Sequence, residues 1–336
     1  MSNVIDNPLV SVVIPAFNAE ATIGETIESV LAQSYPNIEI IVVDDASTDE
    51  TIAQVQKFGD KVSLYKKPHG GIGSTRNYAH ARAQGKYIAW LDSDDLARPE
   101  RLLLQVNALE QHPELSLVSA NFCAFNESGW KQNSYLPEYY TAVAELGGVS
   151  ALYPEKEAVF LANGLCELQV GSVLEGLVYG NFIHPPTVMF PRKLLAQIDP
   201  LLEDISSSVD WYFLARLAEL GKAGLFQVEL IDYRLSARQL SSPYANPASA
   251  LNRLRVFEKI AERYREQLYR CPERYSNALA RLRIDASDAL IPQKRAQARF
   301  LWWKSMCARL LIGPQLKVLV KLLTPAWIFR IKRAVH

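Results

Sequence analysis

The first hundred residues alternate short apolar runs with segments in which apolar residues recur every three or four positions. The runs predict four buried strands, over residues 9–14, 38–43, 62–65 and 86–91. The segments between and after them predict four helices, over residues 22–34, 49–57, 74–84 and 99–111. Strands that alternate with helices of this length indicate βαβ units, so we expect an α/β fold with a mainly parallel sheet.

Local signals mark the ends of several of these elements. Thr22 with Glu25, and Ser47 with Glu50, have the spacing of a capping box, in which side chains satisfy free N–H groups at a helix start. Pro15 closes the first apolar run. These signals predict two side-chain-capped helices and a first strand that ends at the proline.

A helical pattern begins near Pro247 and extends toward the C-terminus. Apolar residues such as Leu254 and Phe257 recur at helical spacing, and later Trp and Phe residues are interleaved with Lys and Arg. We therefore expect two parts, a domain over residues 1–245 and a helical region over residues 246–336.

Charge divides the chain at nearly the same place. The sequence has 36 basic and 36 acidic residues, but residues 1–252 hold 17 Lys/Arg and 30 Asp/Glu, whereas residues 253–336 hold 19 and 6. Basic amphipathic helices with Trp and Phe are typical of segments in a membrane interface, so residues 299–336 are predicted to contact a membrane. One alternative is a helical bundle packed on the first domain, with a solvated basic face. Nucleic-acid binding is another, but the enrichment in Trp, Leu and Ile favours lipid.

Composition excludes several classes of protein. At 49% hydrophobic and 21% charged residues, the chain can form a core and is not disordered. It has no apolar run of the roughly 18–20 residues that a spanning helix needs, and its polar start lacks the regions of a signal peptide. Its cysteines are far apart, which is typical of free thiols in a reducing cytosol. They are Cys123, Cys166, Cys271 and Cys307.

Polar or aromatic clusters follow three of the predicted strands, where ligands bind in parallel sheets. They are Phe17-Asn18, Asp44-Asp45 and the run from Asp92 to Asp95. Neighbouring carboxylates at the end of a buried strand raise each other's pKa unless a cation binds there. The Asp92-x-Asp94 spacing suits a magnesium or manganese ion shared with phosphate oxygens. The alternative is a solvated acidic turn that caps the next helix.

Glycines precede the third predicted helix, in the segment from Gly70 to Arg76. The segment lacks the third glycine of a dinucleotide fingerprint and follows the third strand, so we do not expect a Rossmann cofactor site. Its glycines would let backbone amides approach a phosphate, and Arg76 would contact a diphosphate. A flexible loop with a surface arginine is the alternative. For the pair Asp44-Asp45, a phosphoacceptor receiver domain is a competing interpretation. Such a domain would need a lysine near the end of its last strand, and no such lysine is evident in the sequence.

Four motifs occur in one order, over residues 10–18, 42–49, 73–77 and 90–95. Together they resemble the inverting family-two glycosyltransferases with the GT-A fold. The resemblance is close over residues 9–115 and weakens toward residue 245. It implies a nucleotide-sugar-binding catalytic domain, with helices on both faces of the sheet, over residues 1–245.

The resemblance implies a donor site at the strand ends, made by Pro15, Phe17, Asp45, Arg76, Asp92 and Ser93. Pro15 and Phe17, which replaces the more usual Tyr, would hold the base, and Asp45 would accept a hydrogen bond from its edge. Arg76 would face the diphosphate. Asp94, with Asp92, would hold a divalent metal ion, Mn²⁺ or Mg²⁺.

The family also implies a base that deprotonates the acceptor hydroxyl, carried as an aspartate at the start of a helix. Asp210 fits this frame, although Val209 stands where the family usually has Glu. Asp204 follows Glu203 and is the fallback candidate. On the acceptor side the resemblance suggests His184 and, next to the base, Trp211.

One late segment departs from the family. Many relatives have a histidine where Ser236 stands, so a third contact to metal or diphosphate is in doubt, and Arg234 or Arg238 would be the substitutes. A Gln-x-x-Arg-Trp motif, the mark of processive synthases, is absent from the sequence. Addition of a single sugar is therefore favoured over polymerisation.

These observations predict a cytoplasmic, inverting, metal-dependent glycosyltransferase. It would move a sugar from a nucleotide sugar, expected to be UDP-linked, to a hydroxyl acceptor on a surface polysaccharide or lipid-linked glycan. Residues 299–336 would hold it at the inner face of the plasma membrane. One alternative is a membrane-associated binding or scaffold protein without turnover. Another is a nucleotidyltransferase, which would need a glycine-rich basic loop after the first strand, and Pro15 to Asn18 is not one.

Overall fold

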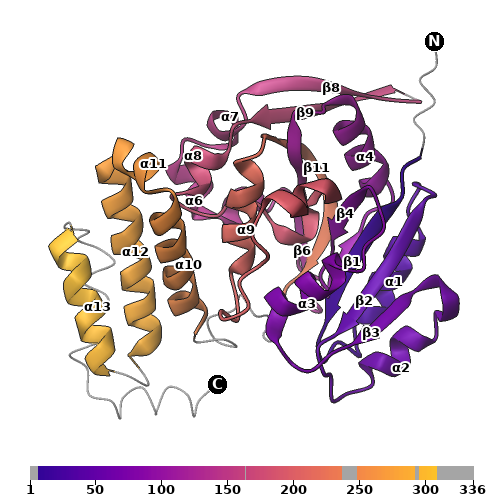
Figure 1. Ribbon diagram of the computed structural model, residues 1–336, viewed down its shortest axis with the longest axis horizontal. Helices are drawn as coiled ribbons and strands as arrows, with labels where there is room; N and C mark the ends of the chain where they lie inside the picture. Colours follow the sequence, from indigo (N-terminus) through magenta and orange to yellow (C-terminus); the bar gives the residue numbers. More distant parts are fainter. Residues whose placement is uncertain (1–6, 163, 237–247, 292–294, 309–336) are drawn as a thin grey trace. The chain divides into compact units, whose positions relative to one another are not determined.

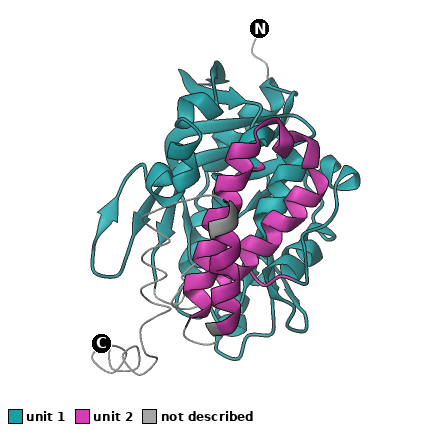
Figure 2. Ribbon diagram, turned by 90° about the vertical axis from the view of Figure 1, so that its left-hand side faces the viewer, with its two compact units in different colours: residues 1–177, 181–204, 209–236 teal, residues 178–180, 205–208, 237–336 magenta. Residues whose placement is uncertain are grey.

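The computed structural model describes residues 7–162, 164–236, 248–291 and 295–308 (Figure 1). The chain forms two compact units (Figure 2). Unit 1 comprises residues 1–177, 181–204 and 209–236. Unit 2 comprises residues 178–180, 205–208 and 237–336.

A single sheet of eleven strands runs through the described part of unit 1. The main strand order is β3 (Ser63–Lys66), β2 (Ile38–Asp44), β1 (Val10–Ala16), β4 (Tyr87–Trp90), β10 (Met189–Pro191), β6 (Leu115–Phe125), β11 (Lys222–Arg234), β9 (Gly164–Gly171) and β8 (Glu155–Leu161). The short strands β5 (Leu96–Ala97) and β7 (Lys131–Gln132) pair with β11 and β6. Neighbours from β3 to β4 are parallel, as are β6 and β11, while β10 runs antiparallel between β4 and β6. The prediction of an α/β fold with a mainly parallel sheet is confirmed.

The longer helices of unit 1 are α1 (Ile23–Leu31), α2 (Thr51–Gln56), α3 (Gly71–His80), α4 (Arg101–Gln111) and α9 (Val209–Ala218). Short helices are α5 (Leu136–Tyr139), α6 (Thr141–Glu145), α7 (Val149–Leu152) and α8 (Leu174–Leu177), and the 3₁₀ turns are η1 (Gly59–Lys61), η2 (Pro185–Thr187) and η3 (Arg192–Gln197). All four strands and four helices predicted in the first hundred residues are present, with ends that differ by no more than four residues.

The central strands form the core because both of their faces are covered. Every residue of β1 and β4 is buried, and so are ten of the eleven residues of β6. The first strand does not end at Pro15 as predicted. Its pairing with β4 stops at Val13, while its pairing with β2 continues to Ala16, so the missing N–H of Pro15 leaves no ladder bond unmade.

Both predicted capping boxes are wrong. Thr22 precedes α1, but its hydroxyl donates to the carbonyl of Ser93 at 2.9 Å and caps no N–H of the helix. The helix α2 begins after Glu50, and the Ser47 hydroxyl accepts from the Asn18 N–H at 2.9 Å. In both cases a partner from another loop competes successfully for the side chain.

The described part of unit 2 is helical, with α10 (Ser249–Arg263), α11 (Arg265–Arg270), α12 (Pro272–Leu290) and α13 (Arg295–Ala308). Helix α12 packs against both α10 and α13. Phe257 of α10 stacks on Tyr275 of α12, and Ala298 of α13 lies in a small core with Ile284 and Leu290. Predicted helices after Ala308 lie outside the described residues. Among the described residues, no helix is both long and apolar enough to cross a membrane.

Candidate active site

Three carboxylates lie in the loop that follows β4. The side chain of Asp92 is 33% exposed, and its Oδ1 accepts from Arg76 at 2.6 Å. Burial and the charge of Asp92 raise the pKa of Asp94 to about 6. Asp95 is fully buried, and burial, then Asp94 and Asp92, raise its pKa well above the ordinary value. Three carboxyl groups therefore crowd the carboxyl end of a buried strand, where burial and mutual repulsion disfavour the ionised forms of Asp94 and Asp95.

The donor set of Asp92 and Asp94 fits a hard divalent cation. Their mutual repulsion would be relieved by a positive ion, and magnesium or manganese binds through one or two carboxylates together with phosphate oxygens. No group of three or more His, Cys, Asp or Glu side chains suited to a metal occurs among the described residues. The two carboxylates therefore fit the predicted ion only together with oxygens of a bound ligand.

Arg76 lies on α3 beside this loop. Its side chain is 3% exposed, its guanidinium pairs with Asp92, and it lies 4.5 Å from the centre of the Trp90 ring. Its Nε atom is buried and has no hydrogen-bond partner in the part of the chain described. Arg76 thus stands next to the predicted cation site, and part of its charge is compensated by Asp92.

Asp45 directly follows β2 and is 4% exposed. Its Oδ1 accepts from the Lys67 ammonium at 2.6 Å and from the Gly70 N–H at 2.9 Å, and its Oδ2 accepts from the Gly71 N–H at 2.8 Å. Burial raises the pKa of Asp45, but the bonds from Lys67, Gly70 and Gly71 outweigh burial and lower it. Asp45 is therefore a fixed carboxylate that anchors the loop before α3.

An exposed aromatic pair lies beside Asp45. The Phe17 side chain is 49% exposed, and its ring centre is 4.9 Å from that of His69. The His69 side chain is 62% exposed, and its Nδ1 lies 3.0 Å from Asp45 Oδ2. Pro15 is buried at the end of β1. No sequence motif pointed to His69 or Lys67, although both follow a strand at the edge where ligands bind in such sheets.

Asp210 lies in the first turn of α9. Burial raises its pKa, the charge of Arg76 lowers it, and the charge of Asp92 raises it. Asn181 donates from Nδ2 to Asp210 Oδ2 at 3.1 Å. The fold therefore brings Asp210 within electrostatic range of Arg76 and Asp92. The fallback Asp204 is an exposed residue of the loop before α9.

The predicted acceptor-side residues are buried. His184 is 3% exposed, its ring stacks on Phe122 with centres 3.9 Å apart, and its Nδ1 is 3.2 Å from the Tyr140 hydroxyl. Burial, then Arg76, lower the pKa of His184 to about 3, so the imidazole is neutral at pH 7. Trp211 is 3% exposed and donates its indole N–H to the Leu177 carbonyl at 2.7 Å. This burial favours a packing role for Trp211 over contact with an acceptor.

Arg234, at the end of β11, contacts the loop after β4 that carries Asp92, Asp94 and Asp95, here called the acidic loop. Its backbone N–H donates to Asp95 Oδ1, its Nε donates to the Asp94 carbonyl, and its Nη2 pairs with Glu25 at 2.5 Å. Ser93 contributes its carbonyl to the Thr22 hydroxyl. Ser236 is exposed, and Arg238 lies outside the described residues. Arg234 is therefore the candidate substitute for the family histidine whose position the structure gives, and it contacts the backbone of Asp94.

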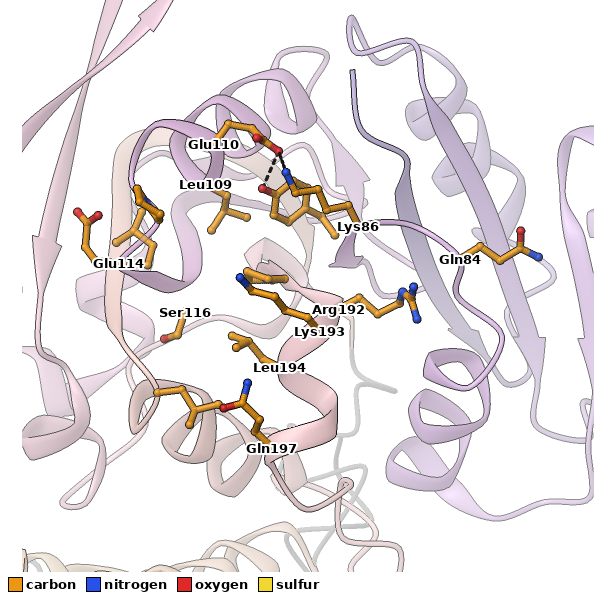
Figure 3. Close-up of a pocket in the computed structure, with 15 residues that line it drawn as sticks. Gln84, Lys86, Leu109, Glu110, Glu114, Ser116, Arg192, Lys193, Leu194 and Gln197 are labelled. Atoms are coloured by element: carbon orange, nitrogen blue, oxygen red, sulfur yellow. Dashed lines mark hydrogen bonds and ion pairs between the residues drawn. The ribbon is translucent and has the colours of Figure 1, made fainter. Parts of the chain in front are cut away.

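A cavity of about 760 Å³ lies elsewhere in unit 1 (Figure 3). Its lining includes Lys86 and Tyr87, where β4 begins, and Leu115 and Ser116, where β6 begins. Glu110 in its wall accepts from the Lys86 ammonium and from the Tyr87 hydroxyl (Figure 3). Because β4 and β6 are parallel, the cavity lies at the opposite end of these strands from the acidic loop.

Residues 11–161 match the family model described as Glycosyl transferase family 2. The chain is 29% identical over 255 residues to an uncharacterized glycosyltransferase of Rickettsia typhi, in an alignment covering 76% of this chain and 70% of that protein. It is 39% identical over 127 residues to the putative teichuronic acid biosynthesis glycosyltransferase TuaG of Bacillus subtilis, covering 37% of this chain and 47% of TuaG.

Two solved structures have a similar fold. Residues 1–349 of S. aureus TarS, in complex with UDP-GlcNAc, match with a TM-score of 0.56 and 18% identity, covering 89% of this chain and 88% of that one. The mannosyltransferase PcManGT from Pyrobaculum calidifontis, in complex with GDP-Man and Mn²⁺, matches with a TM-score of 0.51 and 18% identity, covering 97% and 84%. At such identities the likeness establishes the fold.

Proposed function

Because residues 11–161 match the Glycosyl transferase family 2 model and the chain has the GT-A fold, we propose that this glycosyltransferase moves a sugar from a UDP-linked donor to a hydroxyl acceptor with inversion. The observation that carries the proposal is the convergence of Asp92, Arg76 and Asp210 at one edge of the sheet. A metal-facing carboxylate, a cation for phosphate and a candidate base are the groups that such a displacement needs.

The donor would bind across the strand ends of β1, β2 and β4. Phe17 and His69 offer exposed rings on which a base can stack, and Asp45 is held beside them as a carboxylate. Arg76 would meet the diphosphate, with Asp92 and Ser93 near the ribose. The complex of TarS with UDP-GlcNAc supports the choice of a uridine donor for a fold of this kind.

Asp94 and Asp92 would hold a Mn²⁺ or Mg²⁺ ion, which would offset the charge of the departing nucleoside diphosphate. The presence of Mn²⁺ in the PcManGT complex supports this assignment. Arg234 fixes the backbone of Asp94 through its bond to the carbonyl, so the loop is braced from β11.

Asp210 would act as the base. Its carboxylate would take the proton of the acceptor hydroxyl while that oxygen bonds to the anomeric carbon and the bond from this carbon to the diphosphate breaks. Burial raises the pKa of Asp210 and makes the carboxylate more basic, and the positive charge of Arg76 limits the rise. His184, neutral and buried beside Tyr140, would line the acceptor side.

The acceptor would be a surface polysaccharide or a lipid-linked glycan. The similarity to TuaG, named for teichuronic acid biosynthesis, supports an envelope polymer. We further propose that the catalytic part, residues 1–245, is joined to a membrane-contacting part that includes residues 299–336.

Helix α13 supplies the support for membrane contact. Phe300 is 55% exposed and Trp303 is 62% exposed, and the Lys304 ammonium lies 4.5 Å from the centre of the Phe300 ring. No acidic residue follows Asp288 in the sequence. An exposed face of aromatic and basic residues suits the headgroup region of an anionic bilayer, and we place the protein at the inner face of the plasma membrane.

A thermal-shift panel of nucleotide sugars, with and without Mn²⁺, tests the proposal. A ligand at 100 times its Kd stabilises the folded state by about 2.7 kcal/mol, which raises the Tm by several degrees. We expect a UDP-sugar to give the largest rise, and only with the metal. A panel in which no nucleotide sugar raises the Tm of the folded protein would favour a scaffold without turnover, and a response to nucleoside triphosphates alone would favour a nucleotidyltransferase.

A further inference from the structure

Asn181 is the side-chain hydrogen-bond donor to Asp210 among the described residues. Its Nδ2 lies 3.1 Å from Asp210 Oδ2, and its Oδ1 accepts from the Ile183 N–H, also at 3.1 Å. A backbone N–H can only donate, so the atom facing Ile183 must be the amide oxygen. The amide group that faces Asp210 is therefore the donor, and the orientation of Asn181 is fixed by its own neighbour.

This arrangement makes the two oxygens of Asp210 unequal. Oδ2 is occupied by the amide, whereas Oδ1 accepts from no other side chain in the described part of the protein. An acceptor hydroxyl can therefore approach Oδ1 without displacing another side-chain donor. A carboxylate that turned freely would present either oxygen, at a cost in orientation to the transition state.

The charges and hydrogen bonds around Asp210 also set its pKa. Burial raises the pKa of Asp210 most, the charge of Arg76 lowers it, and the bond from Asn181 also lowers it. Asp92 raises it, and the Tyr140 side chain is within electrostatic range of Asp210. The groups that face Asp210 from α3, from the loop after β4 and from the segment before η2 thus include one cation, one anion and one fixed amide.

We propose that Asn181 is a positioning residue for the base, which holds Oδ2 of Asp210 so that Oδ1 faces the acceptor hydroxyl in its ionised form. The inference rests on the proposed role of Asp210. Sequence motifs gave no sign of it, because Asn181 lies far from α9 along the chain and is brought to Asp210 by the fold.

Asn181→Asp is the most direct test. The new carboxylate keeps an acceptor for the Ile183 N–H, so the loop is retained, but it replaces a donor to Asp210 with a like charge. A like charge raises the pKa of Asp210. The base works only when ionised, and activity is lost as the pH falls through its pKa. We therefore expect the acidic limb of the single-turnover rate to move to higher pH by about one unit.

The measured step is release of nucleoside diphosphate from the nucleotide sugar that the thermal-shift panel selects, with water as the acceptor. Asn181→Ala removes the amide without adding charge and should shift the limb in the same direction by less. Neither variant should change the Tm rise produced by the donor. Asn77→Asp is the matched control, since Asn77 also donates to a carboxylate, that of Glu203, and accepts a backbone N–H, that of Leu201. It should leave the pH limb in place.

The variant Asp210→Asn distinguishes the proposed base role of Asp210 from the proposed positioning role of Asn181. If it binds donor normally but transfers no sugar, the base assignment stands, and an unchanged pH limb in folded Asn181→Asp and Asn181→Ala would overturn the positioning role. If Asp210→Asn turns over at a near-normal rate, the base is not Asp210, the role passes to Asp204, and the positioning role of Asn181 fails with it.

Discussion

Asp94 is the residue on which the proposed cation site depends most. Its pKa is raised to about 6 by burial and by Asp92, so its charged form is disfavoured in the folded protein. The unfolded chain therefore loses this proton first, and the free energy of unfolding of the metal-free protein falls as the pH rises from about 4 through 6. A bound cation would reverse this penalty, since it favours the ionised carboxylate.

Asp94→Ala should accordingly abolish the Mn²⁺-dependent rise in Tm given by UDP, while the metal-free variant is at least as stable as the wild type at pH 7.5. Thermal unfolding with UDP, with Mn²⁺ and with both measures the two effects. Asp60→Ala removes an exposed carboxylate in η1 and is the control, which should keep the metal dependence. Normal UDP affinity of Asp94→Ala in the presence of metal would contradict the assignment.

Other residues of the candidate site differ in how well sequence motifs located them. Asp45, Asp92 and Asp94 follow strands, so their positions at one edge could be predicted from the topology of a parallel sheet. The contacts of Lys67 with Asp45 and of Asn181 with Asp210 could not be predicted, because each joins residues distant in sequence. The burial of Trp211 could not be predicted either, because it depends on the packing of α9 against α8.

At the scale of elements, α3 positions Arg76 by a close approach at Gly73. A Cβ atom at Gly73 would lie 2.2 Å from the carbonyl oxygen of Leu202 and 3.5 Å from Val209. No side chain fits in that space, so the glycine lets α3 touch the loop that leads to α9. Arg76 and Asp210 are held together by this contact between elements.

Gly73→Ala should therefore destabilise the protein by about 1–3 kcal/mol, because the loop before α9 must move away. Urea unfolding measures the change, and the transfer rate should fall with it as Asp210 shifts. Gly24→Ala in α1 is the matched control. Nothing lies within 4 Å of a Cβ there, so alanine should be neutral or stabilising by up to about 1 kcal/mol. Equal effects of the two substitutions would refute the packing argument.

Helix starts show where element-level prediction is limited. The extents of α1 and α2 followed from apolar periodicity, which reflects burial on one face. Their predicted caps were wrong because the Thr22 hydroxyl bonds to Ser93 and the Ser47 hydroxyl to Asn18. A hydroxyl can bond to a nearby backbone group or to a partner from another loop, so the tertiary fold decides which bond forms. In this protein the Thr22 bond ties the start of α1 to the acidic loop.

At the scale of the whole molecule, the two units carry opposite charge and different surfaces. Unit 1 contains the acidic strand-end loops, and the described part of unit 2 ends in α13 with its exposed aromatic rings. Ala298 packs on α12 while Phe300 and Trp303 are exposed, so the helix has one face for the unit and another for a partner. A lipid bilayer is the partner that this second face suits by chemistry.

The double variant Phe300→Ala/Trp303→Ala should weaken binding to vesicles of anionic lipid by about a hundredfold or more, because two rings worth about 1.5–3 kcal/mol each no longer enter the interface. Vesicle sedimentation of the full chain measures it, and raised salt should weaken wild-type binding as well. Tyr269→Ala removes an exposed ring on α11 and should have no effect. Unchanged vesicle binding of the double variant would mean that this face is a solvated surface.

The sequence by itself determined the alternation of elements, the mainly parallel sheet and the resemblance to family-two glycosyltransferases, because these depend on burial patterns and strand-end motifs that are local along the chain. Tertiary structure alone decided which oxygen of Asp210 is occupied, which amides anchor Asp45 and which side chains at helix starts leave their own helix. The physical reason is the same in each case. Apolar burial is nearly independent of the partner, whereas a hydrogen bond or an ion pair exists only when the fold brings a specific atom to about 3 Å.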